Sequence, residues 1–295
     1  MSLPLSGLGV ALATPFTPGG AMDLPDFRGL VRHCVAGGVD FLIPLGSTGE
    51  AATLDEAERD AVIAACLEEA SGRPVIVGTG SNATRQAAAW TARAQALGAR
   101  AALVVTPYYN KPTLDGLVAH YAAVAEAAPG LPLVAYNVPG RTGLNLTPAM
   151  LAKLWEHPSV VAVKESSGNL AQIGEIARTL PPGKTLLSGD DGLALPSISL
   201  GATGLVSVLG NVLPAETKAL VAAALGGDLA SARRQHQRLL PLIDALFLES
   251  NPIPLKAAMA LKGLAADALR LPLVPASETT RAALAQAFTS LEAQS

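Results

Sequence analysis

Eight short apolar runs, separated by longer segments with helical spacing, constrain the fold of this chain more than any other feature. Each run is apolar almost throughout, as is typical of a strand that is buried on both faces of a parallel sheet. Eight strand–helix units of about 25–30 residues each predict an α/β fold, a (β/α)8 TIM barrel. An open doubly wound sheet is the alternative, but no G-x-G-x-x-G motif follows the first run. The runs lie at 9–14, 39–45, 74–80, 101–107, 131–138, 160–165, 184–190 and 202–208.

Two of the intervening segments carry boundary signals. In 54–70, Asp55 precedes an acidic first turn and is a candidate N-cap. In 82–98, Asn82 gives a start signal and Gly98 a stop signal. These segments are therefore expected to form helices with those bounds.

The residues after the eighth unit predict three further helices, around 228–248, 253–264 and 277–292. Proline interrupts the helical pattern between them. We therefore expect a catalytic barrel over 1–225 and a C-terminal helical extension over 226–295 that packs on the barrel.

Composition excludes several classes of protein. The chain has 295 residues, of which 50% are hydrophobic and 15% charged, which is typical of a well-packed globular protein. The net charge of −3, with both signs interspersed, gives no indication of a nucleic-acid surface or a membrane-attracting patch. No apolar run reaches the ~20 residues of a membrane span. No signal peptide is recognisable, so we expect a cytoplasmic protein.

The cysteines and histidines argue against a disulfide framework and a metal centre. Cys34 and Cys66 lie in helix-like segments and are expected to be buried, reduced thiols. The four histidines are scattered and form no recognisable metal motif. The sequence therefore predicts no metal site.

Lys164 is the most unusual polar residue near a strand end, because it follows the buried run 160–163. Active sites of (β/α)8 barrels lie at the carboxyl ends of the strands. Desolvation raises the fraction of neutral amine, which can attack a carbonyl and form a Schiff base. Alternation places Lys164 on one face with the small Ala162. The alternative is a lysine that extends to solvent and pairs with Glu165.

Other strand ends supply groups that suit the same chemistry. Tyr136 ends the neighbouring strand, and its phenol can carry the protons that imine formation requires. Ser47 and Thr48 supply hydroxyl groups, although "GSTGE" (46–50) could equally be a tight turn. Arg141 suits a carboxylate, or is an exposed arginine in a turn. "GDDG" (189–192) could be a simple Asx turn.

Six motifs together resemble the dihydrodipicolinate synthase/N-acetylneuraminate lyase family of barrel aldolases. Within the family, the arginine of the motif "YNVPGRTG" makes the chain more similar to the synthase branch, because lyases of the sialic acid branch lack an arginine at that position. The motifs run in order along nearly the whole chain: "GSTGEAATL" (46–54), "TPYYNKP" (106–112), "YNVPGRTG" (136–143), "VKESSGN" (163–169), "LLSGDD" (186–191) and "NPIPLK" (251–256).

The resemblance implies roles for the catalytic residues. Lys164 matches the Schiff-base lysine that captures pyruvate. Tyr136, Ser47 and Tyr109 match a proton-relay triad, in which Tyr109 comes from the neighbouring subunit. Ser47 replaces the more usual threonine, so the hydroxyl is kept and a positioning methyl group is lost.

The substrate-binding residues are implied in the same way. Thr48 matches a binder of the pyruvate carboxylate, and Arg141 matches the residue that receives the carboxylate of aspartate semialdehyde. Gly189 and Val206 match positions that line the pocket near the lysine.

The activity that the resemblance implies is condensation of pyruvate with L-aspartate 4-semialdehyde, without a cofactor, in a homotetramer built from tight dimers. One alternative is another pyruvate aldolase of the family, which cleaves a 2-keto-3-deoxy sugar acid or N-acetylneuraminate. A second is a non-catalytic binder of pyruvate-like acids.

The resemblance also implies where the end product L-lysine would bind in sensitive members. Gln86 stands where those enzymes place a glutamate, and Arg59 adds a like charge, so weak or absent inhibition is expected. The matching positions are Ala51, Ala52, Glu56, Arg59, Asn82, Gln86 and Tyr108.

Overall fold

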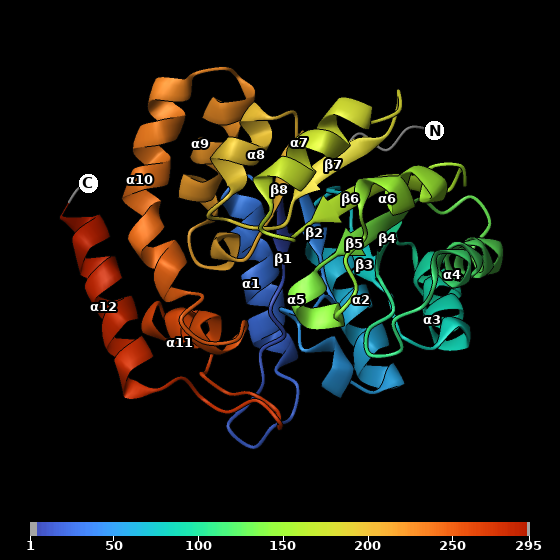
Figure 1. The fold of residues 1–295 in the computed structure, drawn as a ribbon. Coiled ribbons are helices and arrows are strands. Elements are labelled where there is room, and N and C mark those ends of the chain that lie inside the picture. Colours follow the sequence, from blue (N-terminus) through green and yellow to red (C-terminus); the bar gives the residue numbers. More distant parts are fainter. Residues whose placement is uncertain (1–4, 294–295) are drawn as a thin grey trace.

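The eight strands form one parallel sheet in the order β2-β1-β8-β7-β6-β5-β4-β3. A bridge between Leu42 and Val75 joins the two outer strands, so the sheet closes into a (β/α)8 barrel. The computed structural model describes residues 5–293 (Figure 1). The strands are β1 (Gly7–Ala11), β2 (Phe41–Ile43), β3 (Ile76–Gly78), β4 (Ala101–Val105), β5 (Leu133–Asn137), β6 (Val160–Glu165), β7 (Thr185–Ser188) and β8 (Gly204–Ser207).

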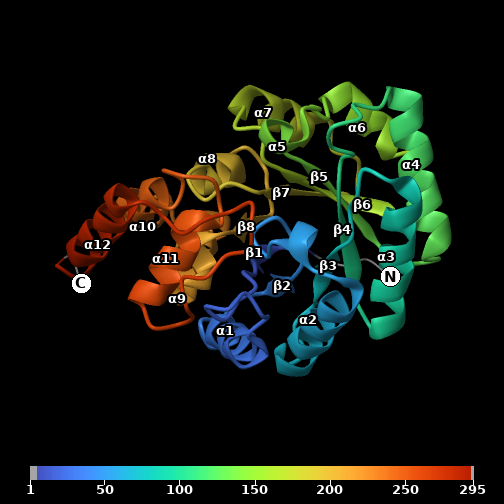
Figure 2. The same ribbon diagram turned by 90° about the horizontal axis from the view of Figure 1, so that it is seen from below.

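Helices follow the strands and cover the outside of the barrel (Figure 2). They are α1 (Leu24–Ala36), α2 (Glu56–Glu69), α3 (Thr84–Leu97), α4 (Leu114–Ala127), α5 (Pro139–Thr142), α6 (Pro148–Leu154), α7 (Leu170–Thr179), α8 (Ala194–Ser199) and α9 (Pro214–Leu225). The chain continues with α10 (Leu229–Ala245), α11 (Ile253–Leu261) and α12 (Glu278–Glu292), and short 3-10 turns occupy Ala51–Thr53 and Leu209–Asn211.

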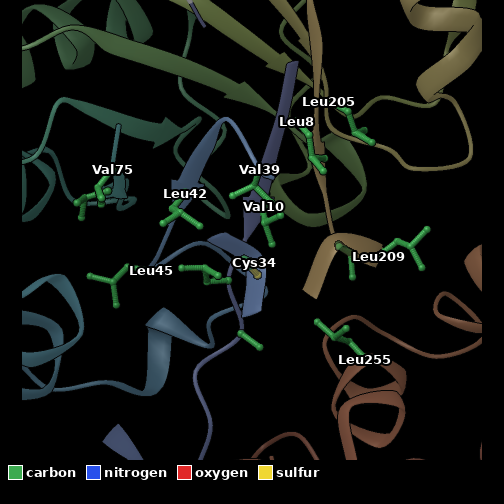
Figure 3. Packing of buried hydrophobic residues seen from close by; sticks show 14 of the residues in the cluster. Leu8, Val10, Cys34, Val39, Leu42, Leu45, Val75, Leu205, Leu209 and Leu255 are labelled. Atoms are coloured by element: carbon green, nitrogen blue, oxygen red, sulfur yellow. The ribbon is translucent and has the colours of Figure 1, made fainter. Parts of the chain in front are cut away.

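The core has two layers because successive side chains of a strand point to opposite faces. On β1, Leu8 and Val10 belong to the cluster between barrel and helices, whereas Ala11 belongs to the barrel interior. Figure 3 shows Leu8 and Val10 in the outer layer, into which Leu255 of α11 also packs. The C-terminal helices therefore share the barrel's apolar core.

Two sequence-based bounds need correction. The first strand was expected at 9–14 but runs from Gly7 to Ala11, because the backbones of β1 and β8 approach closely at its start. A Cβ on Gly204 would lie 2.3 Å from the carbonyl oxygen of Gly7, so only glycine permits this pairing.

The start of α3 also differs from the expectation. Asn82 does not cap the helix; the cap position is Ala83, whose N–H donates to the Ser81 hydroxyl oxygen at 3.2 Å. The other signals are confirmed: Asp55 caps α2 in a reciprocal capping box with Glu58, and Gly98 ends α3 at φ 106°.

Cys34 and Cys66 are buried free thiols, as predicted. Across residues 5–293, no helix has the length and apolar character needed to cross a bilayer.

Candidate active site

Lys164 lies on the interior face of β6 near the carboxyl end of the strand, above Ala162 as the alternation predicted. Its side chain is 6% exposed, and its ammonium lies 4.2 Å from the ring centroid of Tyr136. The two residues are register partners on β6 and β5. A buried cation against an aromatic face is stabilised by the ring quadrupole, which keeps the amine beside the phenol.

Glycine at position 189 makes room for this lysine. A Cβ built on Gly189 would lie 2.7 Å from Lys164 Cε and 2.0 Å from Ser166 Oγ. Such distances are far below ordinary contact, so any larger residue would displace the lysine stem. Val206, 1% exposed on β8, completes the interior layer with Leu187 of β7.

The alternative of an ion pair between Lys164 and Glu165 is wrong. Glu165 points to the other side of β6, where its carboxylate accepts hydrogen bonds from Asn137 Nδ2 at 2.9 Å and the Ser167 N–H at 2.6 Å. The Gln172 amide donates to it at 3.3 Å. Strand alternation separates the two side chains, and within residues 5–293 no carboxylate forms an ion pair with Lys164.

A cavity of about 410 Å³ opens beside these residues at the carboxyl ends of the strands. Ser47, Tyr136 and Arg141 line it, and so do residues of the C-terminal segment such as Asn251 and Leu273. The structure thus brings together a hydroxyl group from the loop after β2, a phenol from β5 and a guanidinium from α5. Lys164, Thr48 and Val206 are buried, and neither they nor Gly189 are among the residues that line the cavity in this structure.

Thr48 and Arg141 share one partner that the sequence reasoning missed. Asn251 Nδ2 donates to Thr48 Oγ1 at 2.9 Å, and Arg141 Nη2 donates to the main-chain carbonyl of Asn251 at 2.8 Å. Thr48 is 3% exposed, whereas Arg141 is exposed at the rim. The motif "NPIPLK" (251–256) marked Asn251 as part of the family pattern. Its local sequence does not indicate which strand end the residue reaches.

The loop 46–50 has a strained backbone that buried contacts hold in place. Leu45 and Glu50, at its two ends, have left-handed φ values of 61° and 49°. Thr14 Oγ1 donates to the Gly49 carbonyl at 2.8 Å. Glu50 forms an ion pair with Lys256 of α11, in which each side chain is 1% exposed.

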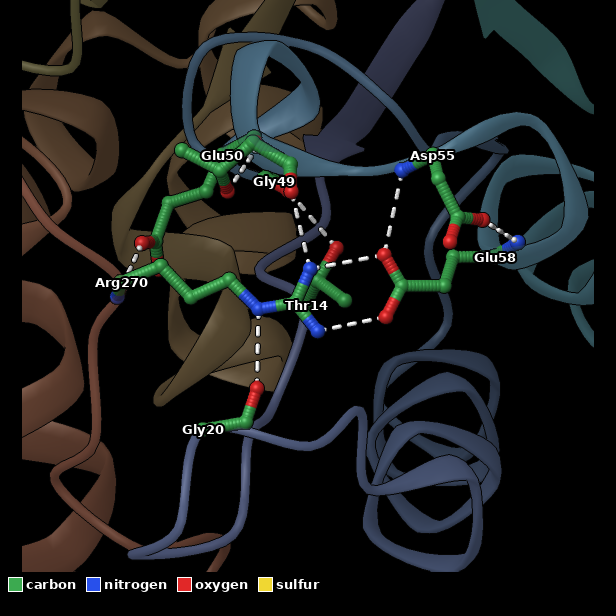
Figure 4. A network of polar contacts seen from close by, with 8 residues as sticks. Thr14, Gly20, Gly49, Glu50, Asp55, Glu58 and Arg270 are labelled. Atoms are coloured by element: carbon green, nitrogen blue, oxygen red, sulfur yellow. Dashed lines mark hydrogen bonds and ion pairs between the residues drawn. The ribbon is translucent and has the colours of Figure 1, made fainter.

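Arg270 adds a second link between the C-terminal segment and this loop (Figure 4). Its N–H donates to Glu50 Oε2 at 3.1 Å, and its guanidinium donates to Gly20 O at 2.9 Å and forms an ion pair with Glu58. The guanidinium of Arg270 holds the pKa of the Glu58 carboxyl below its ordinary value. Arg270 of the C-terminal segment therefore holds the loop that carries Ser47 through Glu50 and Glu58.

Tyr109 does not reach the cavity of its own chain. Its side chain is 91% exposed on a loop with φ 73°, and its N–H donates to Thr142 O at 3.3 Å. Its neighbour Tyr108, 37% exposed, lines the cavity instead. The exposed phenol of Tyr109 is available for contact with another molecule.

Arg59 is one of the residues that line the cavity. Its guanidinium stacks on the Trp90 ring at 3.8 Å and donates to the carbonyls of Ala51 at 3.1 Å and Gly78 at 3.0 Å. Burial lowers the pKa of this guanidinium to about 10. Among the positions implied for lysine binding, Ala51, Ala52, Arg59 and Tyr108 line the cavity, and Glu56, Asn82 and Gln86 do not.

The aspartates after β7 have structural contacts. The Gly192 N–H donates to Asp190 Oδ1 at 2.9 Å, which confirms the Asx turn. Asp191 is buried, accepts hydrogen bonds from the Ser207 hydroxyl and from the Val208 N–H at 2.8 Å, and thereby ties β7 to β8. Burial raises the pKa of Asp191 to about 6.

A closed parallel barrel with a buried lysine at the end of its sixth strand, beside a tyrosine and an open cavity, defines an aldolase-type (β/α)8 enzyme. Comparison with known proteins narrows this class. The chain belongs to the dihydrodipicolinate synthetase family, whose model matches residues 4–291.

Individual relatives match over nearly their full length. A 4-hydroxy-tetrahydrodipicolinate synthase of Thermomicrobium roseum is 50% identical over 97% of this chain and 94% of its own. The crystal structure of dihydrodipicolinate synthase from Thermotoga maritima is 41% identical and superimposes with a TM-score of 0.95 over 97% of this chain and 98% of its own. A monomeric dihydrodipicolinate synthase variant is 40% identical, with a TM-score of 0.95 over 97% of both chains.

Proposed function

We propose that this enzyme condenses pyruvate with L-aspartate 4-semialdehyde through a Schiff base on Lys164, as a lyase of lysine and diaminopimelate biosynthesis. The observation that carries the proposal is the 6% exposed Lys164, whose ammonium lies 4.2 Å from the Tyr136 ring in space that Gly189 leaves open. The membership of the family and the full-length relatives named as synthases support it.

The first half-reaction activates pyruvate. The neutral amine of Lys164 attacks the keto carbon, and loss of water gives a protonated imine. A proton then leaves the methyl group, and the electron pair of that C–H bond moves toward the nitrogen to give an enamine. Tyr136 is assigned to carry protons to and from the reacting oxygen and nitrogen, together with Ser47, because both line the cavity.

The second half-reaction forms the new carbon–carbon bond. The enamine carbon attacks the aldehyde carbon of the second substrate, whose oxygen takes a proton. The amino group of that substrate then attacks the imine carbon and displaces Lys164, which closes the ring and frees the enzyme. Arg141, at the exposed rim of the cavity, is assigned to the carboxylate of the semialdehyde, and Thr48 to that of pyruvate.

Borohydride reduction in the presence of pyruvate tests the mechanism. We expect intact protein to gain one reduced pyruvyl group, which peptide mass spectrometry locates at Lys164. Lys164→Ala and Lys164→Arg should both abolish trapping, because a guanidinium stays protonated and does not form the imine. Absence of the adduct from wild-type protein would refute the Schiff base. Turnover with aspartate semialdehyde, set against cleavage of 2-keto-3-deoxy sugar acids, tests the substrate.

We also propose a homotetramer of tight dimers in which Tyr109 acts in the partner's site. The support is the 91% exposed phenol on a loop that ends beside the cavity. Mixing Tyr109→Phe protein with Lys164→Ala protein should restore activity in hybrid dimers, since one site then holds both native residues. No recovery after verified subunit exchange would contradict the shared site.

Two further proposals concern organisation and location. We propose that residues 1–225 form the catalytic barrel and 226–295 an extension that completes its site, because Asn251, Lys256 and Arg270 contact the loop that follows β2. We propose a cytoplasmic location, which the buried free thiols Cys34 and Cys66 support.

A further inference from the structure

Asn251 connects the C-terminal extension to both carboxylate-binding groups of the proposed reaction. It precedes α11 and is 7% exposed, and it lines the cavity. Its side-chain amide donates to Thr48 Oγ1 at 2.9 Å, while its main-chain carbonyl accepts from Arg141 Nη2 at 2.8 Å. One residue therefore contacts a group assigned to pyruvate and a group assigned to the semialdehyde.

The contact with Thr48 determines what that hydroxyl can do. A hydroxyl group has one proton to donate and accepts through its oxygen. Because Asn251 Nδ2 already donates to the oxygen, the Thr48 proton remains for a different acceptor. Thr48 is 3% exposed, so its hydroxyl has little water with which to compete. A substrate carboxylate is the acceptor that such a hydroxyl binds best, because the hydrogen bond is then charge-assisted.

The other end of the Asn251 amide makes no hydrogen bond. Its Oδ1 is buried and has no hydrogen-bond partner within residues 5–293. The amide therefore acts on Thr48 through its donor end alone. An aspartate would have nearly the same shape but could only accept, so the Thr48 proton would turn toward it and away from the substrate.

We propose that Asn251 is a positioning residue whose amide orients the Thr48 hydroxyl as a hydrogen-bond donor to the pyruvate carboxylate. This inference rests on the proposed function, because the carboxylate that Thr48 receives is the one delivered to Lys164. It predicts that Asn251 acts on pyruvate capture through Thr48 and has little effect once pyruvate is saturating.

The experiment measures borohydride-trapped pyruvate on Lys164 and steady-state turnover, each against pyruvate concentration. The variants are Asn251→Ala, Asn251→Asp, Thr48→Val and the double variant Asn251→Ala/Thr48→Val. Ser250→Ala is the matched control, because its side chain lies exposed in the same turn. Thermal unfolding verifies that each variant is folded.

We expect Asn251→Ala to raise half-saturating pyruvate about ten-fold, which corresponds to ~1.4 kcal/mol, with kcat changed less than three-fold. Asn251→Asp should raise it further, because the reversed hydrogen bond and the added charge both oppose the carboxylate. In the Thr48→Val background, Asn251→Ala should cause less than a two-fold additional change, since the hydroxyl that it orients is absent.

Two results would overturn the inference. One is half-saturating pyruvate within two-fold of wild type for both Asn251 variants. The other is an undiminished effect of Asn251→Ala in the Thr48→Val background, which would show that Asn251 acts independently of Thr48. Failure of wild-type protein to trap pyruvate at Lys164 would instead reject the proposed function, and the inference with it.

Discussion

Gly189→Ala is expected to slow Schiff-base formation by about 10- to 100-fold. The added Cβ would lie 2.7 Å from Lys164 Cε and 3.0 Å from Lys164 Cγ. Restoring an ordinary carbon–carbon contact of about 3.5 Å therefore requires the lysine stem to move by about 0.8 Å. A displacement of that size moves the amine from its position over the Tyr136 ring and away from the incoming carbonyl carbon.

The same overpacking should lower the free energy of unfolding by about 1–3 kcal/mol. Single-turnover trapping with pyruvate and borohydride gives the rate of imine formation, and urea denaturation gives the stability. Gly192→Ala is the matched control in the same loop, because its nearest neighbours are Asp190 Oδ1 at 3.4 Å and Ile243 Cγ2 at 3.8 Å. Folded Gly189→Ala protein that traps pyruvate at the wild-type rate would refute this account of how the lysine is positioned.

Four further outcomes are expected. Arg141→Ala should raise half-saturating aspartate semialdehyde far more than half-saturating pyruvate, because a charge-assisted hydrogen bond of ~1.5–3 kcal/mol is lost; equal effects on both substrates would make it structural. L-Lysine should inhibit weakly, since Gln86 offers its ammonium an amide; half-inhibition well below ~1 mM, about 4 kcal/mol of binding, would contradict this. The pKa of Asp191 is raised by burial from 3.8 to about 6, so its contribution to stability is complete below pH 4 and lost as the pH rises through 6. The stability of wild type relative to Asp191→Asn should thus fall by roughly 3 kcal/mol over that range, measured by urea denaturation; a flat difference would refute the raised pKa. Lys256→Met should cost about 3–5 kcal/mol, because the Glu50 carboxylate stays buried without its ion-pair partner, and Glu50→Gln/Lys256→Met should recover part of that loss in the same assay.

Local sequence patterns predicted the elements that depend on neighbouring residues. Apolar runs located all the strands, because burial on both faces removes the need for polar positions. Asp55 was identifiable as a cap since its partner Glu58 is three residues away. Asn82 also has the side chain of a typical N-cap. In the structure, however, α3 starts one residue later, with Ala83 at the cap position.

Contacts between distant segments were not predictable in this way. Lys164 could be placed near the end of a buried strand, but the partners of Glu165 on the opposite face, such as Asn137, became known only from the structure. Asn251 and Thr48 are 203 residues apart, and no periodicity or spacing connects such positions. The sequence therefore predicted the site residues at the strand ends but not the distant residues that contact them.

The buried links between Glu50, Lys256 and Arg270 also order events during synthesis of the chain. Glu50 and Arg270 are separated by 220 residues, so a ribosome adding 5–20 residues per second delivers the arginine roughly 10–40 s after the glutamate. Lys256 is delivered shortly before Arg270, so the Glu50 carboxylate has neither of these partners until the C-terminal segment is made. A chain that terminates before Asn251 can contain every strand and still lacks the groups that shape its catalytic loop. Completion of the catalytic loop therefore waits for synthesis of the C-terminal segment.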